Sequence, residues 1–493
     1  MSVLSGLEPE RVFYYFEKIC GIPHGSYHEK AISDYLVDFA KEHGRTVYQD
    51  DLYNVIMLVE ASEGYEGEEP LILQGHMDMV CEKTAAATLD MEKEGLCLET
   101  DGTYVYAKDT TLGGDDGIAV AYMLAIAERS DLPHPPLELV FTVCEEVGME
   151  GADAIDLSNL RGRRMLNLDS EEEGIFLSSC AGGISTHSKL PIQRQSSEEM
   201  DWYTLEVTGL LGGHSGCEIH KGRANANRIL ARVLEELRRE CTIALYALEG
   251  GKKDNAIPLY AAACIGLKTE EAGQVMEQIN RLDAELKTEY AETDAGITLV
   301  LHRVQGKERR SVLGEESVSA LLALLTELPD GVQSMSREVE GLVETSLNLG
   351  IVCLYDDHLF LQHSIRSSVT ASKLQMAEQV EKLVISRGGT VERKGDYPAW
   401  EYREQSAVRN KVIRLYQELY GTEPVVEGIH AGLECGLLAG KIKDLDCVSM
   451  GPDILDIHTT SERLDIESTR RVYAFLLEYL KRKDDEDADW NRV

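Results

Sequence analysis

A histidine and an aspartate follow the most informative apolar run of the chain. In residues 71–80, LILQGHMDMV, aliphatic residues lead to Gly75, and His76 and Asp78 come directly after it. The run has the length and composition of a buried strand, and a glycine permits a sharp exit from it. Because α/β enzymes keep their sites at the carboxyl ends of sheet strands, we expect a metal ligand and its support at this point.

Four further clusters of acidic residues or histidine recur along the chain. One opens an apolar helix after a glycine-rich loop, two end strand-like runs, and the last lies near the carboxyl terminus. In order they are Asp115 with Asp116, Glu145 with Glu146, Asp169, and His458. A hydrolytic site with two metals needs oxygen and nitrogen donors, a bridging carboxylate and one acid/base residue left unligated. Two histidines, three carboxylates and one spare carboxylate meet that requirement.

Each cluster alone has a plainer interpretation. A histidine beside an aspartate is more often a satisfied pair, and adjacent glutamates usually form a solvated face, as we expect for residues 171–173. Recurrence at strand ends, in order and before a distant histidine, favours a metal site.

Longer segments around these residues resemble a known family. GHMDMV, TLGGDDGIAVAY, CEEVGMEGA, LNLDSEEEG and GGHSG, with the late His458, resemble aminoacylase and carboxypeptidase-type di-zinc metallopeptidases. Within that group, KDTTLGGDDGIA, GGHSGCEIHKGRANANRIL and IHAGLECGLLAGK are similar to the aminoacyl-histidine dipeptidases, also called Xaa-His dipeptidases or peptidase D. The resemblance covers almost the whole chain. One departure is the second glycine of GGDDG, where alanine is common in the family, and it leaves Asp115 in place.

The resemblance implies a role for each clustered residue. His76 and Asp169 hold one metal, Glu146 and His458 hold the other, and Asp115 bridges the two. Glu145 is then the general base for a metal-bridging hydroxide that attacks the peptide carbonyl. Asp78 fixes the orientation of His76, and Asp116 is interpreted as a supporting residue. Zinc is the expected metal, and cobalt and manganese accept the same donors.

Candidate substrate-binding residues lie outside these clusters. His214, in the GGHSG turn, is expected to reach the substrate, although it could instead only order the turn. The amide of Asn255 could donate to a substrate carbonyl. Arg366 suits a terminal carboxylate, or an internal acid. Glu434 is expected to anchor the free amino group of a dipeptide.

Alternating helical and strand-like stretches predict the fold. Residues 9–19 and 28–44 have helical spacing, residues 54–60 and 70–75 are strand-like, and residues 117–129 form an apolar helix. The alternation predicts an α/β fold with a mixed, mostly parallel sheet flanked by helices, which the resemblance identifies as zinc-exopeptidase-like.

Candidate ligands at both ends of the chain must meet, so the catalytic domain is expected to be discontinuous. We place it at residues 1–183 and 396–493, with an inserted α+β lid domain at 184–395. A helix at 408–421, a strand at 446–451 and an amphipathic helix at 470–483 should complete it, and the charged tail 484–493 should be mobile.

The lid domain is expected to contain two βα halves. The first has a strand at 202–209 and a helix at 226–240. The second has strand-like runs at 298–304, 346–357 and 358–368 and a helix at 371–389. A doubled lid could close a site within one subunit, whereas a single lid would depend on a homodimer, so both arrangements stay open.

Composition excludes several functions. A formal net charge of −38 over 493 residues argues against nucleic acid as a partner, and no apolar run is long enough to span a membrane. The eleven cysteines are scattered without CxxC spacing, which is typical of reduced thiols in the cytoplasm.

The leading hypothesis is therefore a cytoplasmic di-zinc metallo-dipeptidase acting on Xaa-His or a broader range of dipeptides. The alternatives are an amidohydrolase or deacylase of N-acyl amino acids on the same scaffold, and a non-catalytic homologue.

Overall fold

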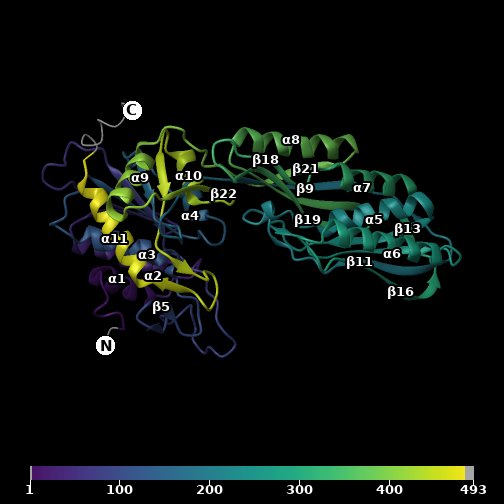
Figure 1. Ribbon diagram of the computed structural model, residues 1–493, viewed down its shortest axis with the longest axis horizontal. Coiled ribbons are helices and arrows are strands. Elements are labelled where there is room, and N and C mark those ends of the chain that lie inside the picture. The colour runs from purple at the N-terminus through teal and green to yellow at the C-terminus, as the bar shows by residue number, and fades with distance from the viewer. Residues whose placement is uncertain (1–2, 484–493) are drawn as a thin grey trace. The chain divides into compact units, whose positions relative to one another are not determined.

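The computed structural model describes residues 3–483, and its contacts divide the chain into two compact units (Figure 1). Unit 1 comprises residues 1–179, 402–428 and 433–493, and unit 2 comprises residues 180–401 and 429–432. The predicted boundaries lie at 183/184 and 395/396, and the return of residues 429–432 to unit 2 is not predicted. The predicted mobile tail, 484–493, lies outside the described residues.

An eight-stranded sheet in the order β1-β2-β6-β3-β7-β23-β8-β22 forms the centre of unit 1. The four strands β6, β3, β7 and β23 are parallel, whereas β1, β2 and β8 pair antiparallel to their neighbours. The predicted mixed α/β fold is confirmed, with the parallel pairs confined to the middle of the sheet. In chain order the strands are β1 (Thr46–Gln49), β2 (Val55–Val59), β3 (Leu71–His76), β6 (Leu137–Thr142), β7 (Arg164–Asn167), β8 (Ile175–Cys180), β22 (Val425–Ile429) and β23 (Asp446–Ser449).

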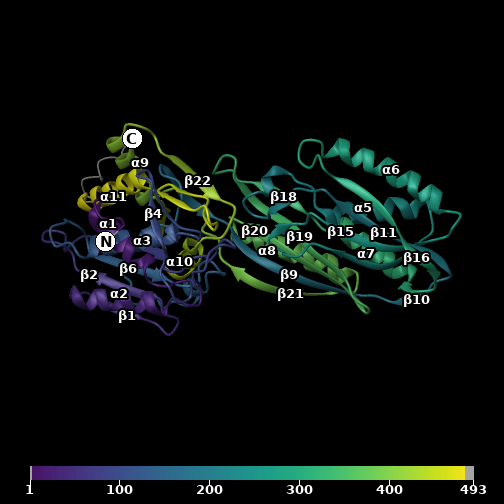
Figure 2. The ribbon, with the colours of Figure 1, turned by 90° about the horizontal axis from the view of Figure 1, so that it is seen from below.

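Helices from both ends of the chain cover this sheet and share one core (Figure 2). Every residue of α3 is buried, because the helix is apolar on all sides. On α3, Tyr122 stacks on Tyr473 of α11 and donates its hydroxyl to the Thr469 carbonyl. The helices are α1 (Glu10–Cys20), α2 (Lys30–Glu42), α3 (Gly114–Ala127), α4 (Glu150–Ala154), α9 (Ala407–Tyr420), α10 (Glu434–Lys441) and α11 (Ile466–Lys481).

A small four-stranded sheet joins two distant parts of unit 1. It has the order β24-β25-β5-β4, so the segment that carries His458, between β24 and β25, is tied to the segment just before α3. Its strands are β4 (Leu98–Thr100), β5 (Tyr104–Ala107), β24 (Ile454–Leu455) and β25 (Arg463–Asp465).

Unit 2 is built on one antiparallel sheet whose main path is β16-β11-β15-β13-β19-β20-β9-β21, with β18 paired to β19. Its strands are β9 (Gly182–Pro191), β11 (Met200–Thr208), β13 (Ile243–Gly250), β15 (Ala261–Leu267), β16 (Thr298–Glu308), β18 (Gly331–Met335), β19 (Val343–Leu354), β20 (His358–Ser367) and β21 (Thr390–Tyr397). Two short pairs accompany it, namely β10 (Arg194–Ser196) with β17 (Ser311–Leu313), and β12 (Gly213–His214) with β14 (Ala256–Ile257).

The helices of unit 2 pack with this sheet in a second core. They are α5 (Ala226–Glu240), α6 (Ala272–Glu289), α7 (Glu315–Glu327) and α8 (Thr370–Ser386), with a short 3₁₀ turn at Ile219–Lys221. The sequence analysis groups residues 298–304 with the second half of this domain, but β16 pairs with β11 of the first half. No helix is predicted at α6 or α7.

Candidate active site

The parallel strands bring candidate ligands to one edge of the sheet of unit 1. His76 ends β3, Asp169 lies just beyond β7, and Glu145 and Glu146 lie just beyond β6. Since β3 pairs in parallel with both β6 and β7, the three carboxyl ends face the same way. Side chains that follow these strands therefore lie at one edge of the sheet.

Two histidines converge on one aspartate. The Nε2 atom of His76 lies 3.1 Å from Asp115 Oδ1 and 3.4 Å from Asp169 Oδ1. The Nε2 atom of His458 lies 3.1 Å from Asp115 Oδ2 and 3.0 Å from Glu146 Oε1. Asp115 therefore faces one histidine with each oxygen. Three overlapping groups have possible ligand atoms within 4.8 Å of one another, namely His76, Asp116 and Asp169; His76, Glu145 and Glu146; and Asp115, Glu146 and His458.

Crowding of these groups shifts their pKa values. Burial raises the pKa of Asp169 to about 7 and raises that of Glu145 well above its usual range. Burial acts in the same direction on Asp115, but hydrogen bonds from His458 and His76 outweigh it and lower that pKa. The hydrogen bond to Asp115 is the largest cause that raises the pKa of His458 to about 10. Imidazole and carboxylate donors gathered at this density fit divalent cations, which offset the mutual repulsion of the acids.

Asp78 supports the cluster through the backbone. Its carboxylate accepts the N–H groups of Glu145 at 3.0 Å and Glu146 at 3.3 Å, and the Ser26 hydroxyl at 2.8 Å. The Nδ1 atom of His76 lies 3.0 Å from the Asp78 carbonyl oxygen and 3.4 Å from its carboxylate. Nε2 of the same ring is thereby left facing the carboxylates.

Asp116 is bonded to the end of β3. Its Oδ2 atom accepts the N–H of His76 at 3.2 Å, and a Cβ atom at Gly75 would lie 2.4 Å from that oxygen. Only glycine at this position lets the start of α3 approach the strand so closely. Burial raises the pKa of Asp116 well above its usual range. Its supporting role stays a prediction.

Glu462 connects two segments that carry candidate ligands, and the sequence analysis missed it. Its buried carboxylate accepts the N–H groups of Leu112 at 2.8 Å, Gly113 at 3.2 Å and Gly114 at 2.8 Å. These residues directly precede Asp115, whereas Glu462 follows His458 by four positions. Nothing in the spacing indicates this partnership, because the bonded residues lie about 350 positions apart.

The backbone at His458 adopts a left-handed conformation, with φ of 60°. A residue with a Cβ atom rarely adopts this conformation, and such residues gather at functional sites. His458 is also the most exposed of the converging side chains, at 46%.

Glu434 lies inside unit 1 with no exposed surface. Its Oε2 atom accepts the Gln74 amide at 2.5 Å and the Thr142 hydroxyl at 2.6 Å. Burial raises its pKa to about 8. The other oxygen, Oε1, has no hydrogen-bond partner among the described residues. The role of Glu434 as an amine anchor stays a prediction, and the structure places the carboxyl in the interior and not on an open wall.

His214 in unit 2 is held in one tautomer. Its Nδ1 atom accepts the N–H groups of Gly216 at 3.3 Å and Cys217 at 3.1 Å, so in the neutral ring the proton resides on Nε2. Burial, followed by the charge of Arg366, lowers its pKa. Asn255 lies beside the same turn, since its backbone carbonyl accepts the N–H of Ser215 at 2.9 Å. The residue is exposed.

Arg366 belongs to the same part of unit 2. The residue is only 9% exposed. Its guanidinium donates to the Tyr397 hydroxyl at 3.0 Å, and its Nε has no partner among the described residues. The described part of the chain shows no acid paired with it. Nearby His430 bonds Ser346 through Nε2 at 2.7 Å, and burial lowers its pKa to about 3. The candidate substrate residues thus fall into separate sets, with Glu434 in unit 1 and the others in unit 2.

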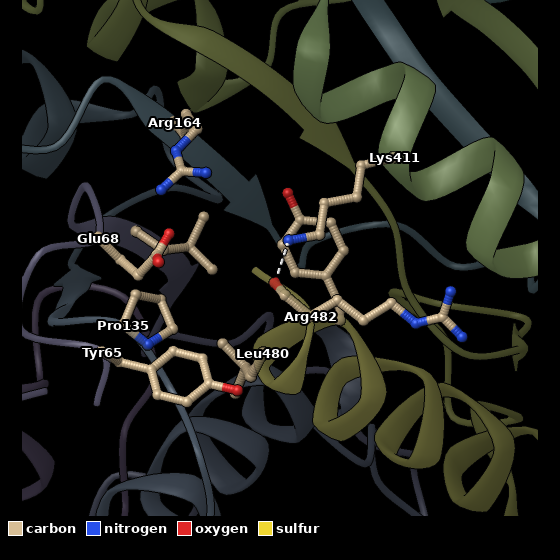
Figure 3. Close-up of a pocket in the computed structure, with 9 residues that line it drawn as sticks. Tyr65, Glu68, Pro135, Arg164, Lys411, Leu480 and Arg482 are labelled. Atoms are coloured by element: carbon tan, nitrogen blue, oxygen red, sulfur yellow. Dashed lines mark hydrogen bonds between the residues drawn. The ribbon is translucent and has the colours of Figure 1, made fainter. Parts of the chain in front are cut away.

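A separate pocket in unit 1 has Arg164, Lys411 and Arg482 among the residues that line it (Figure 3). Its volume is about 10 Å³, which is room for a single water molecule. Lys411 Nζ donates to the Arg482 carbonyl at 2.7 Å, which the figure shows as a dashed line. The pocket lies beside the end of α11, and none of the candidate site residues lines it.

Comparison with known proteins identifies the family. The chain is 37% identical over 482 residues to the cytosol non-specific dipeptidase of Escherichia coli K12, covering 98% of this chain and 99% of that protein. Residues 205–294 match the model of the M20 peptidase dimerisation domain. The chain belongs to the M20 peptidase family.

Solved structures agree with this M20 assignment. Aminoacylhistidine dipeptidase from Vibrio alginolyticus is 34% identical and matches with a TM-score of 0.90 over 97% of both chains. Aminopeptidase PepT from Bacillus cereus is 16% identical, with a TM-score of 0.56 over 96% of this chain and 98% of that one, and shares the fold. Among the described residues of this M20 peptidase, no helix is both long and apolar enough to cross a bilayer.

Proposed function

We propose that this M20 peptidase is a cytosolic dipeptidase that works with two divalent metal ions. Zinc is the metal that we propose first, ahead of cobalt and manganese. The observation that carries the proposal is the convergence of His76 and His458 on the two oxygens of Asp115. The E. coli relative is named as a cytosol non-specific dipeptidase, and the Vibrio structure as an aminoacylhistidine dipeptidase. We therefore assign a broad range of dipeptides, with Xaa-His among them.

The distances support a division of the ligands. His76 and Asp169 would hold one ion, Glu146 and His458 would hold the second, and Asp115, which faces one histidine with each oxygen, would serve both. Two such ions, when bound, lower the pKa of a water molecule and polarise a carbonyl group.

Glu145 is the proposed general base. Its backbone N–H is bonded to Asp78, and its carboxyl forms no ion pair in the described part of the chain. With cations bound at the neighbouring ligands, their charge would favour the ionised carboxylate, which would accept a proton from the attacking water. The same carboxyl then returns a proton to the leaving amine. If Glu145 instead bound a metal as Glu146 does, no base would remain at this edge.

Unit 2 supplies the proposed polar contacts to the substrate. Nε2–H of His214 donates to the carbonyl oxygen as negative charge develops there, and Asn255 adds a second donor. The planar guanidinium of Arg366 binds the terminal carboxylate with two parallel hydrogen bonds. The match of residues 205–294 to a peptidase dimerisation domain supports a homodimer formed through this unit.

Comparing a free dipeptide with its N-acetylated form tests the function. A dipeptidase that anchors the free amino group, as we propose for Glu434, hydrolyses Ala-His much faster than N-acetyl-Ala-His. Because acetylation would leave this buried polar group without its partner, we expect a difference of about 100-fold or more in kcat/KM. Equal or faster turnover of the acetylated peptide would favour a deacylase on the same scaffold. Removal of metal by a chelator should abolish activity, and addition of zinc should restore it.

A further inference from the structure

A pocket of about 390 Å³ opens beside the candidate ligand Glu146 in unit 1. Its volume lies within the range of small-molecule binding sites. Residues from three segments line it, at 25–26 with 28, at 79–82 and at 91–92, together with Glu146 and Val147. The wall is connected to the candidate active site, because Ser26 in the first segment donates its hydroxyl to Asp78. A group in this pocket is therefore adjacent to the proposed reaction centre.

The floor of the pocket is apolar and adaptable. Met79 and Met91 are buried, and Val147 is exposed beside them. Methionine has an unbranched, polarisable side chain that adjusts to ligands of different shape. Such a floor accommodates the aliphatic stem of a long side chain.

The rim of the pocket is acidic. Glu82 and Glu92 line it, and no lysine or arginine is among the residues that line it. Glu82 forms no ion pair in the described part of the chain, and the partner of Glu92 is His28, 3.9 Å away. A cation on a four-carbon stem could place its stem on the methionines and its charge at the partly hydrated rim.

We propose that this pocket receives the side chain of the N-terminal residue of the dipeptide, and that it favours a long cationic side chain such as that of lysine or arginine. The inference rests on the proposed dipeptidase function and specifies its preferred substrates. The pocket lies in the catalytic unit, whereas the proposed ligand for the C-terminal carboxylate, Arg366, lies in unit 2.

Two pairs of dipeptides separate the effect of the lysine ammonium group from that of its aliphatic chain. Norleucine has the straight aliphatic chain of lysine without the ammonium group, so the ratio of kcat/KM for Lys-Ala to that for Nle-Ala measures the effect of the charge. We expect a ratio of about two to five, the size of an exposed ion pair. In Glu82→Gln/Glu92→Gln the ratio should fall towards one, and the ratio for Ala-Lys to Ala-Nle should keep its wild-type value.

A matched control and a second variant complete the test. Glu60→Gln/Glu63→Gln removes the same charge from exposed positions outside the pocket and should leave the Lys-Ala to Nle-Ala ratio unchanged. Val147→Trp, which fills the pocket, should lower kcat/KM for both Lys-Ala and Nle-Ala relative to Ala-Ala.

Three results would overturn the pocket assignment. The wild-type ratio of Lys-Ala to Nle-Ala could be one or less, or it could fall equally in Glu60→Gln/Glu63→Gln. Alternatively, Glu82→Gln/Glu92→Gln could lower the ratio of Ala-Lys to Ala-Nle instead. Failure of the wild-type enzyme to hydrolyse any of these dipeptides would overturn the proposed function itself.

Discussion

Adjacent residues in this site have different surroundings. Glu146 lies 3.0 Å from His458, whereas Glu145 forms no ion pair in the described part of the chain, and burial raises its pKa. Both N–H groups are bonded to Asp78, so the backbone is fixed and the two carboxylates are free to serve different purposes. We propose that these surroundings, and not the residue type, make Glu146 a ligand and Glu145 the base.

Glu145→Gln should lower kcat by about 10²–10⁴-fold, because an amide cannot accept the proton of the attacking water. Metal content, measured by mass spectrometry after dialysis, should stay at two ions per chain. Glu146→Gln is the matched variant, and it should lose metal as well as activity. Loss of metal from the Glu145 variant would show that the two roles are reversed.

Arg366→Ala should raise KM for dipeptides by about 10- to 100-fold, because a buried hydrogen bond between charged groups contributes about 1.5–3 kcal/mol. The corresponding dipeptide amides, which have no terminal carboxylate, should be affected far less. Steady-state kinetics with both substrate types gives the comparison, and Arg366→Lys should restore part of the binding through its charge alone. An equal loss with acids and amides would contradict carboxylate binding.

At the scale of elements, a single carboxylate joins two loops. Glu462 holds the turn that precedes Asp115 while lying four residues after His458. It thereby ties together the two segments that carry these candidate ligands. Residues that orient ligands in this way commonly affect metal affinity.

Glu462→Gln should weaken metal binding by about 10- to 100-fold, since one amide oxygen replaces two carboxylate oxygens that accept N–H groups. Titration calorimetry with zinc measures the affinity directly. Glu467→Gln, an exposed position on α11, is the control and should bind zinc like the wild type. Wild-type zinc affinity in Glu462→Gln would contradict a role for Glu462 in positioning the ligands.

The sequence predicts the candidate residues at the strand ends better than it predicts the buried residues that hydrogen-bond around them. The helices near 10–20 and 226–240 and the strand at 71–76 are confirmed, because each has a clear apolar periodicity. Glu462 and the Gln74–Glu434–Thr142 network escape prediction, since their partners are distant in sequence. The placement of β16 is missed because pattern does not determine which strand is its neighbour.

At the scale of the molecule, each unit has its own core and its own buried polar groups. His363 of β20 has no exposed surface, and neither ring nitrogen has a hydrogen-bond partner among the described residues. Burial, followed by the charge of Arg228, lowers its pKa to about 3. The folded state therefore keeps this imidazole neutral over most of the pH range.

His363→Leu should make the stability of the protein less dependent on pH. In the wild type the folded pKa is depressed, so the contribution of this histidine is complete above about pH 6.5 and is lost as pH falls towards 3. At pH 5 this loss is about 2 kcal/mol. Denaturant unfolding at pH 7 and pH 5 gives the two free energies. His302→Asn, at an exposed site, should retain the wild-type difference, and an unchanged difference in the leucine variant would contradict the argument.

The central claim is that distant segments hold two metal ions around Asp115. A crystal structure of the zinc-loaded enzyme, with anomalous scattering recorded at the zinc edge, tests it most directly. We predict two zinc peaks: one bound by His76, Asp169 and Asp115, the other by Glu146, His458 and Asp115, with Glu145 bound to neither. A single peak, or a peak coordinated by Glu145, would contradict the account.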